Sequence, residues 1–136
     1  MKSLQGKGIV ITGAASGIGE ALAHLCAQRG AKLLLADLNA ERLHTLRTTL
    51  RGKGAEVSVM HVDVSERDTV EALAERARQL WGAADVLINN AGVAVVAPVE
   101  SMREVDARWL MDVNFWGAWY GCRAFLPQLK SRPAAC

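Results

Sequence analysis

Residues 12–19 read TGAASGIG, and this stretch decides how the rest of the chain is interpreted. It lies between an apolar run, GIVIT (8–12), and a stretch with the spacing of an amphipathic helix. Glycines between a strand and a helix let backbone N–H groups approach a phosphate at the positive end of the helix. Gly13 would form the tight turn, Gly17 would leave room for the phosphate, and Gly19 would let the helix pack closely on the sheet. We expect a pyrophosphate site here, the alternative being a turn that uses glycine for geometry alone.

Short apolar runs alternate with longer amphipathic stretches along the whole chain, which predicts strands at 8–12, 32–37, 56–64 and 85–90. Helices are expected over 20–29, from Asn39 to about Arg51, from Ser65 to about Trp81, and from Ser101 to about Lys130. Asn39, Ser65 and Ser101 would cap the last three of these helices. This β-α-β-α-β-α-β-α order predicts an α/β fold with parallel strands and helices on both faces. Residues 1–136 would form one domain, with no second domain.

The composition is that of an ordinary folded protein, with 51% apolar and 22% charged residues and a net charge of +2. The charges form no basic stripe, so we expect neither a nucleic-acid nor a membrane-surface partner. No apolar run approaches the roughly 18 residues of a membrane span. The three cysteines lack CxxC spacing, which favours reduced thiols and a cytoplasmic location. The histidines fall on separate elements, and no metal site is expected.

An acidic residue, Asp37, closes the second expected strand, 18 residues after Gly19. A carboxylate at this place can accept hydrogen bonds from the hydroxyls of an adenosine ribose. It would also repel a 2′-phosphate, and the nearest cation, Arg42, lies a turn into the following helix. NAD is therefore favoured over NADP. Taken singly, Asp37 could equally be a turn or capping residue.

The chain resembles the short-chain dehydrogenase/reductase family over residues 5–130. The resemblance rests on five features in the expected order, namely TGAASGIG at 12–19, Asp37, Asp63-Val64, NNAG at 89–92 and Asn114. It implies a Rossmann-type, doubly wound parallel sheet. It also implies a reversible hydride transfer between a nicotinamide cofactor and a small alcohol or carbonyl substrate, whose identity the sequence leaves open.

The resemblance also implies roles for particular residues. Asp63 and Val64 would flank the adenine ring, and Asn114 would take the family's catalytic-asparagine position, where its main chain holds a water of the proton relay. The full set of cofactor-binding residues would be Thr12, Gly13, Ser16, Gly17, Ile18, Gly19, Asp37, Leu38, Asp63, Val64, Asn90, Ala91 and Gly92. Without the resemblance, the acids and asparagines could be turn formers, and Asn114 a polar helix residue.

The chain departs from the family pattern after Asn114. The family's catalytic Ser and Tyr-x-x-x-Lys are absent, because the single tyrosine, Tyr120, is followed four residues later by Ala124. Where the resemblance implies a fifth strand, the chain reads SRPAAC (131–136). We expect an incomplete dinucleotide-binding domain, truncated after the fourth strand and the long helix, as a fragment, a frameshift end or a natural truncation. The alternatives are a non-catalytic nucleotide-binding or interaction subunit and a non-functional product.

Apolar residues cover much of the circumference of the last expected helix, namely Trp109, Val113, Phe115, Trp116, Trp119, Tyr120, Phe125 and Leu126. A helix that is apolar all round must be buried on more than one side. The resemblance implies that one of those sides packs against a partner subunit, so a homo-oligomer formed through this helix is expected.

Overall fold

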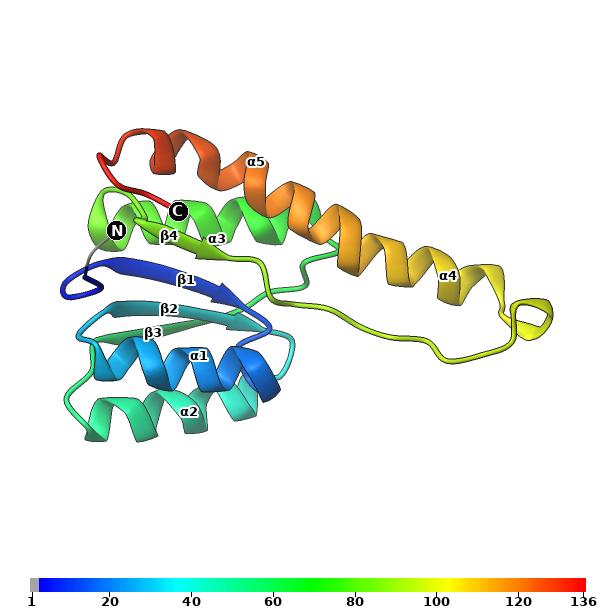
Figure 1. The fold of residues 1–136 in the computed structure, drawn as a ribbon, viewed down its shortest axis with the longest axis horizontal. Coiled ribbons are helices and arrows are strands. Elements are labelled where there is room, and N and C mark those ends of the chain that lie inside the picture. Colours follow the sequence, from blue (N-terminus) through cyan, green and yellow to red (C-terminus); the bar gives the residue numbers. More distant parts are fainter. Residues whose placement is uncertain (1–2) are drawn as a thin grey trace.

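Four runs of aliphatic residues form one parallel sheet, shown in Figure 1 for the described residues 3–136 of a computed structural model. The strands are β1 (Gly8–Thr12), β2 (Lys32–Asp37), β3 (Val57–His61) and β4 (Val86–Ile88). They lie in the order β3-β2-β1-β4, and every neighbouring pair is parallel. This order confirms the predicted doubly wound, Rossmann-type sheet. The third and fourth strands are shorter than predicted, since the ladders end before Val62 and Asn89.

The helices follow the predicted alternation: α1 (Gly17–Gln28), α2 (Ala40–Gly52), α3 (Arg67–Trp81), α4 (Glu104–Met111) and α5 (Gly117–Lys130). A short 3₁₀ turn, η1 (Val99–Ser101), precedes α4, and a π-helical segment, η2 (Asp112–Trp116), joins α4 to α5. The first helix begins at Gly17, inside the glycine turn, rather than at residue 20. The last predicted helix is continuous but contains one wide π turn, which its apolar pattern does not reveal.

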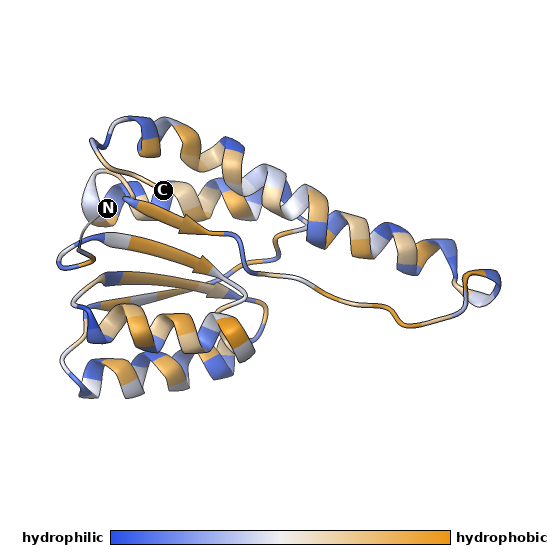
Figure 2. Ribbon diagram, viewed as in Figure 1, coloured by the Kyte–Doolittle hydropathy of each residue, from blue (hydrophilic) through white to orange (hydrophobic). Residues whose placement is uncertain are grey.

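Strict alternation of side chains divides the core into two layers. Ile9 and Ile11 of β1 pack with residues of α1 and α2 on one face of the sheet. Val10 packs on the other face, with residues of α3 and with Phe125 of α5. Figure 2 shows β1, β2 and β4 as mainly hydrophobic ribbons. The sheet is therefore covered on both faces, as its almost uninterrupted apolar strands require.

The predicted helix caps are confirmed in one case and wrong in two. Asn39 accepts a hydrogen bond from the backbone N–H of Arg42 at 3.0 Å, as an N-cap should. The hydroxyl of Ser65 instead donates to Asp63 Oδ1 at 2.6 Å, and α3 begins after Glu66. The hydroxyl of Ser101 donates to the carbonyl of Pro98 at 3.2 Å, and this serine ends η1 rather than capping α4. Both serines serve the preceding turn.

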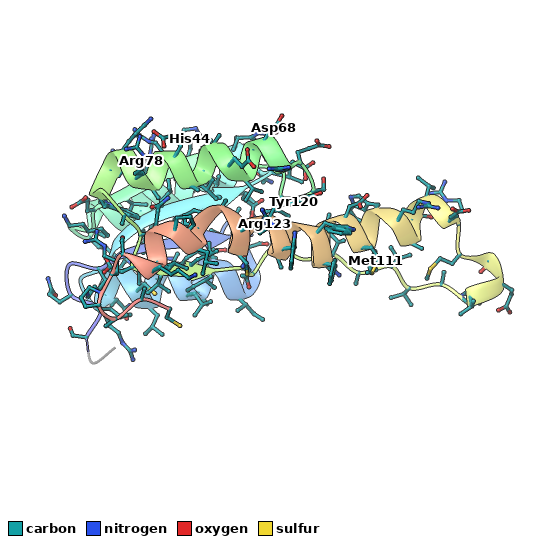
Figure 3. The ribbon with its side chains drawn as sticks, turned by 90° about the horizontal axis from the view of Figure 1, so that it is seen from above. His44, Asp68, Arg78, Met111, Tyr120 and Arg123 are labelled. Atoms are coloured by element: carbon teal, nitrogen blue, oxygen red, sulfur yellow. The ribbon has the colours of Figure 1, made fainter. Side chains whose placement is uncertain are left out.

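Residues 93–111, which we call the arm, project beyond the end of the sheet in two perpendicular views (Figures 1 and 3). The arm consists of an extended segment, η1 and α4. Val96 is 98% exposed, and none of the described residues of α4 is buried. The chain by itself therefore leaves much of the last predicted helix uncovered, and burial of a second side against a partner subunit stays a prediction. Of its eight apolar residues named above, Val113 and Phe125 are buried among the described residues.

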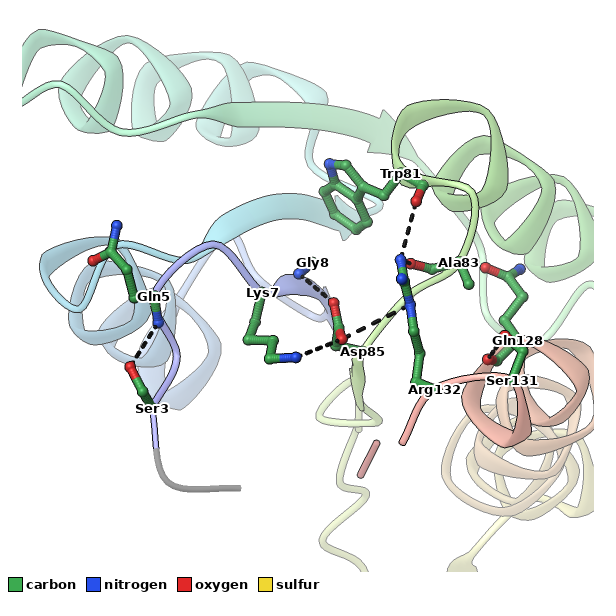
Figure 4. A network of polar contacts seen from close by, with 10 residues as sticks. All are labelled: Ser3, Gln5, Lys7, Gly8, Trp81, Ala83, Asp85, Gln128, Ser131 and Arg132. Atoms are coloured by element: carbon green, nitrogen blue, oxygen red, sulfur yellow. Dashed lines mark hydrogen bonds and ion pairs between the residues drawn. The ribbon is translucent and has the colours of Figure 1, made fainter. Parts of the chain in front are cut away.

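A polar cluster fixes the opposite end of the sheet (Figure 4). The buried carboxylate of Asp85 accepts hydrogen bonds from the backbone N–H of Gly8 at 3.0 Å and from Lys7 Nζ at 3.1 Å. Arg132 lies 3.8 Å from the same carboxylate and donates to the carbonyl groups of Trp81 and Ala83. Burial opposes ionisation of Asp85, but these donors and cations outweigh it and lower its pKa.

Candidate cofactor-binding site

A cavity of about 390 Å³ opens at the carboxyl ends of the strands, on the side away from the Asp85 cluster. It is bounded by the loops that follow the four strands and by one helical face. In an open parallel sheet this edge is where ligands bind. Its lining residues are Gly13, Ser16, Gly17, Ile18, Asp37, Leu38, Val62, Asp63, Val64, Asn90, Ala91, Gly92, Val93, Trp109 and Val113.

The structure thus brings most of the predicted site together in one cavity. Thr12 and Gly19 do not line it but are buried directly behind its wall. Asn114, on η2, does not line it either. The roles of all these residues remain predictions, and the geometry below describes what each can do.

The glycine turn has its shape for steric reasons. Gly13 (φ +64°) and Gly17 (φ +53°) adopt left-handed conformations that residues with a Cβ rarely populate. A Cβ on Gly13 would also lie 2.7 Å from Ala91 Cα. At Gly19 a Cβ would strike the carbonyl oxygen of Gly13 and lie 2.6 Å from Asn90 Nδ2. The turn therefore folds tightly against the segment after β4.

The N-terminus of α1 offers free donors to the cavity. Ser16 occupies the N-cap position in an extended conformation, and its side chain makes no capping hydrogen bond. The first hydrogen bond into the helix runs from Glu20 N to the Ser16 carbonyl. Within residues 3–136, the N–H groups of Ile18 and Gly19 have no acceptor. Unsatisfied donors at the positive end of a helix are suited to an anionic group such as a pyrophosphate.

Asp37 is held in a fixed orientation at the end of β2. Its Oδ2 accepts from the backbone N–H of Ala15 at 2.9 Å, and its Oδ1 accepts from that of Asn39 at 3.0 Å. Each carboxylate oxygen can accept a further hydrogen bond, so the group can still receive two hydroxyl donors. The described lining residues include the carboxylates of Asp37 and Asp63 but no lysine or arginine.

The carboxylate of Asp63 is oriented by hydrogen bonds from Ser65 to one of its two oxygens. Its Oδ1 accepts from both the N–H and the hydroxyl of Ser65, at 2.9 and 2.6 Å. These bonds turn the loop after β3 and leave Oδ2 without a partner among the described residues. Val62 and Val64, its buried neighbours, supply apolar surface to the same part of the cavity.

Thr12 and Asn90 lock the glycine turn to the end of β4. Thr12 is 3% exposed, and its hydroxyl accepts from the backbone N–H of Asn90 at 3.1 Å and from that of Ala91 at 3.2 Å. In return, Asn90 Nδ2 donates to the carbonyl groups of Thr12 and Gly13, both at 3.0 Å. These reciprocal bonds give a structural reason for Thr-Gly and Asn-Ala-Gly to occur together.

Asn114 is bonded to the start of the arm. Its Oδ1 accepts from the backbone N–H of Val93, and its Nδ2 donates to the Val93 carbonyl, both at 2.8 Å. One helical turn later, Gly117 packs so closely on Val64 that a Cβ would lie 2.9 Å from Val64 Cγ2. The π turn thus sits between a polar clamp and a close helix contact, an arrangement frequent near functional sites.

The sequence prediction missed four lining residues, namely Val62, Val93, Trp109 and Val113. Trp109 and Val113 are four residues apart and therefore on one helix face. Their spacing, read together with the neighbouring Asn114, could have placed that face at the cavity. Within residues 3–136, no group of three or more His, Cys, Asp or Glu side chains could hold a metal ion. No helix among the described residues is long and apolar enough to cross a membrane.

Comparison with known proteins gives this cavity a family context. A family model for short chain dehydrogenases matches residues 7–135. Oxidoreductase UcpA of Salmonella typhimurium is 37% identical over 132 residues, which is 97% of this chain and 50% of that protein. The chain spans about half the length of the curated relatives it matches.

Solved structures show the same fold at high similarity. A short chain dehydrogenase/reductase from Burkholderia phymatum in complex with NAD has a TM-score of 0.94 and 39% identity, over 98% of this chain and 48% of that one. L-sorbose reductase from Gluconobacter frateurii, complexed with NADPH and L-sorbose, has a TM-score of 0.92 and 32% identity, over 96% and 50%. A family match over nearly the whole chain, together with this fold, shows that the chain belongs to the short-chain dehydrogenase family.

Proposed function

We propose that these residues form the NAD-binding part of a short-chain oxidoreductase that transfers hydride between the nicotinamide and a small alcohol or carbonyl substrate. The observation that carries the proposal is the arrangement of groups in one cavity. Free N–H groups at the start of α1 face it, together with a carboxylate fixed at the end of β2. A dinucleotide presents a pyrophosphate and a ribose diol at matching places. The bound cofactor would supply the hydride acceptor or donor.

In this proposal each part of the chain has a separate task. The turn 13–19 holds the pyrophosphate through backbone N–H groups, and Asp37 with Leu38 holds the adenosine ribose. Asp63 accepts from the adenine amino group through its free Oδ2, and the 90–92 segment shapes the opposite wall. Asn114 fixes the start of the arm and, through its main chain, serves the proton relay of the proposed oxidoreductase.

Calorimetric titration of the chain with NAD tests the proposal directly. We expect saturable one-site binding with a Kd between about 1 µM and 1 mM, the range in which enzymes commonly hold their substrates. Gly17→Ala should weaken binding, because Gly17 has φ +53° and lines the cavity. Gly52→Ala is the matched control, since a Cβ there meets no atom within 4 Å and α2 ends far from the cavity. Absence of binding in the wild-type chain would overturn the proposal.

The preference for NAD over NADP rests on Asp37. Its carboxylate is held by two backbone N–H groups and would meet a 2′-phosphate at close range, with no lysine or arginine among the described lining residues. Replacing it by Asp37→Ser should reduce the ratio of NAD to NADP affinity by at least about tenfold. The substitution also removes the hydrogen bonds of Asp37 to the turn, which should weaken the binding of both cofactors equally and so cancel in the ratio. Asp106→Ser, on the arm, should leave the ratio unchanged.

A second candidate function is a non-catalytic nucleotide-binding subunit. The position of Tyr120 favours it, because this tyrosine stacks on Trp116 with ring centroids 6.2 Å apart and lines a different hollow, beside Arg67 and Arg123. A chain that binds NAD but oxidises or reduces no alcohol or carbonyl by itself would support this candidate. Turnover by the isolated chain would exclude it.

We further propose that copies of the chain associate through the last helix and that the protein acts in the cytoplasm. Large apolar residues are exposed on η2 and α5, and such surface commonly marks an interface; they are Phe115, Trp116, Trp119 and Leu126. For the cytoplasmic location, the supporting observation is Cys26, a buried free thiol whose pKa is raised by burial, as expected of a cysteine that stays reduced. Sedimentation at micromolar concentration should show a dimer or larger species, and a monodisperse monomer would contradict the association.

A further inference from the structure

One aromatic side chain enters the cavity from an element that the other lining residues do not share. Trp109 belongs to α4, on the arm, whereas almost all of the remaining lining residues follow the ends of strands. Trp109 is 46% exposed, and among the described lining residues it is the only aromatic. A large apolar ring that is both exposed and part of a cavity wall gains from covering by a flat ligand.

The position of Trp109 within the cavity follows from its helix neighbours. Gly117 packs against Val64, and Val113, one turn earlier, is buried with Val64 in the same core layer. Trp109 lies one further turn along the same helix face. The helix therefore presents Val113 and then Trp109 beside Val64 and Asp63. This side of the cavity is apolar with one carboxylate, which suits a heteroaromatic base bearing an amino group.

We propose that Trp109 forms the wall of the adenine subsite and packs against the base of the bound dinucleotide. The inference rests on the proposed function and extends it, because it assigns part of the cofactor affinity to the arm. It also gives the arm, none of whose described residues is buried, a role in binding the adenine base. An arm that contacts the base would become better ordered when the adenine half of the cofactor binds.

Titrations with ADP and with nicotinamide mononucleotide separate the two halves of the ligand. Trp109→Ala should weaken ADP binding about tenfold, since stacking of a base on an aromatic ring is worth about 1–3 kcal/mol. Trp109→Phe, which keeps an aromatic face, should bind ADP within about threefold of the wild type. Binding of nicotinamide mononucleotide should be unchanged in both variants.

Trp119→Ala is the matched control, because Trp119 is 48% exposed on α5 and lines a separate hollow. It should bind ADP like the wild type. Fluorescence gives a second readout: ADP should quench the Trp119→Phe chain but have a much smaller effect on the Trp109→Phe chain. Thermal unfolding of both alanine variants checks that the fold is intact, since neither tryptophan is buried.

Each outcome has a distinct meaning. If the wild-type chain binds ADP and NAD but Trp109→Ala binds them equally well, the inference is wrong and the proposed function stands. If the wild-type chain binds neither nucleotide, the proposed function and the inference both fail. If ADP binds without quenching Trp109, this ring does not contact the base and the inference is likewise overturned.

Discussion

The sheet unit (residues 3–92) and the arm (residues 93–111) have similar apolar residues in opposite environments. Val10 in β1 is 0% exposed, covered by helices that follow it in the chain, whereas Val96 on the arm is 98% exposed. The contrast teaches that apolar sequence predicts burial only where the chain also supplies the covering element. The proposed cofactor site lies where the two regions meet, with walls from both.

We expect the largest change in stability and in NAD affinity from a substitution at Gly19, which packs closely against the backbone of Gly13. In Gly19→Ala the new Cβ would strike the Gly13 carbonyl oxygen, and the turn cannot move without breaking the Asn90 bonds. We expect a loss of about 3 kcal/mol in the free energy of unfolding and a large loss of NAD affinity. Urea denaturation and calorimetry measure the two. Gly52→Ala, an open helical position, serves as the control, and an equal effect there would contradict this account.

A matched pair of valines tests the comparison itself. Val10→Ala should lower the free energy of unfolding by about 2.5 kcal/mol, because a fully buried side chain loses its contacts. Val96→Ala should change it by less than about 0.5 kcal/mol. Similar losses at both positions, measured by urea denaturation, would mean that Val96 is covered in solution and would contradict the contrast between the sheet unit and the arm.

Loss of the hydroxyl that joins the two halves of the site should be nearly as costly. Thr12→Val keeps the side-chain shape but leaves the N–H group of Ala91 without an acceptor. It also removes one of two acceptors of the Asn90 N–H group, which keeps its bond to the carbonyl of Ile88 at 3.1 Å. We expect a loss of about 2 kcal/mol and weaker NAD binding. Thr12→Ser should restore most of both. In contrast Thr45→Val, on the exposed face of α2, removes a bond to its own helix and should have little effect. If Thr12→Val changed neither the free energy of unfolding nor NAD binding, the proposed role of this hydroxyl in joining the turn to β4 would be wrong.

The smallest effect concerns the Asp85 cluster and depends on pH. Because the folded state lowers the pKa of Asp85, its contribution is fully present above the unfolded value of about 3.9 and is lost as pH falls through the lower folded value. Asp85→Asn should cost about 1.5 kcal/mol at pH 7 and flatten the loss of stability on acidification. Unfolding curves at pH 7, 3.5 and 2.5 measure this, and identical pH profiles for variant and wild type would contradict it.

The first two strands and α2 were predicted within a residue because their signals are local. KLLLAD (32–37) is an unbroken apolar run, and Asn39 caps the helix that follows. The ends of β3 and β4 were overestimated because apolar or turn-forming residues continue past the last ladder bond. Ser65 has the sequence pattern of a helix cap, but its hydroxyl instead donates to Asp63, two residues before it.

Other features depend on contacts between distant residues. The π turn accompanies the clamp between Asn114 and Val93, 21 residues apart, and no periodicity records that pairing. The glycine turn was found from its composition, whereas its lock to Asn90 needed the fold. Trp109 has the helical spacing of an apolar surface, and only the fold, in which the chain returns from the arm through α4 toward the strand ends, brings it into the cavity.

Amide hydrogen exchange with and without NAD tests the central claim most directly, because it locates the ligand in the chain. The account predicts slower exchange at the N–H groups of Ile18 and Gly19 and along 90–92 when NAD is present, with no change at the far end of α2. Protection confined to other parts of the chain, or none at saturating NAD, would contradict the assignment of this cavity as the cofactor site.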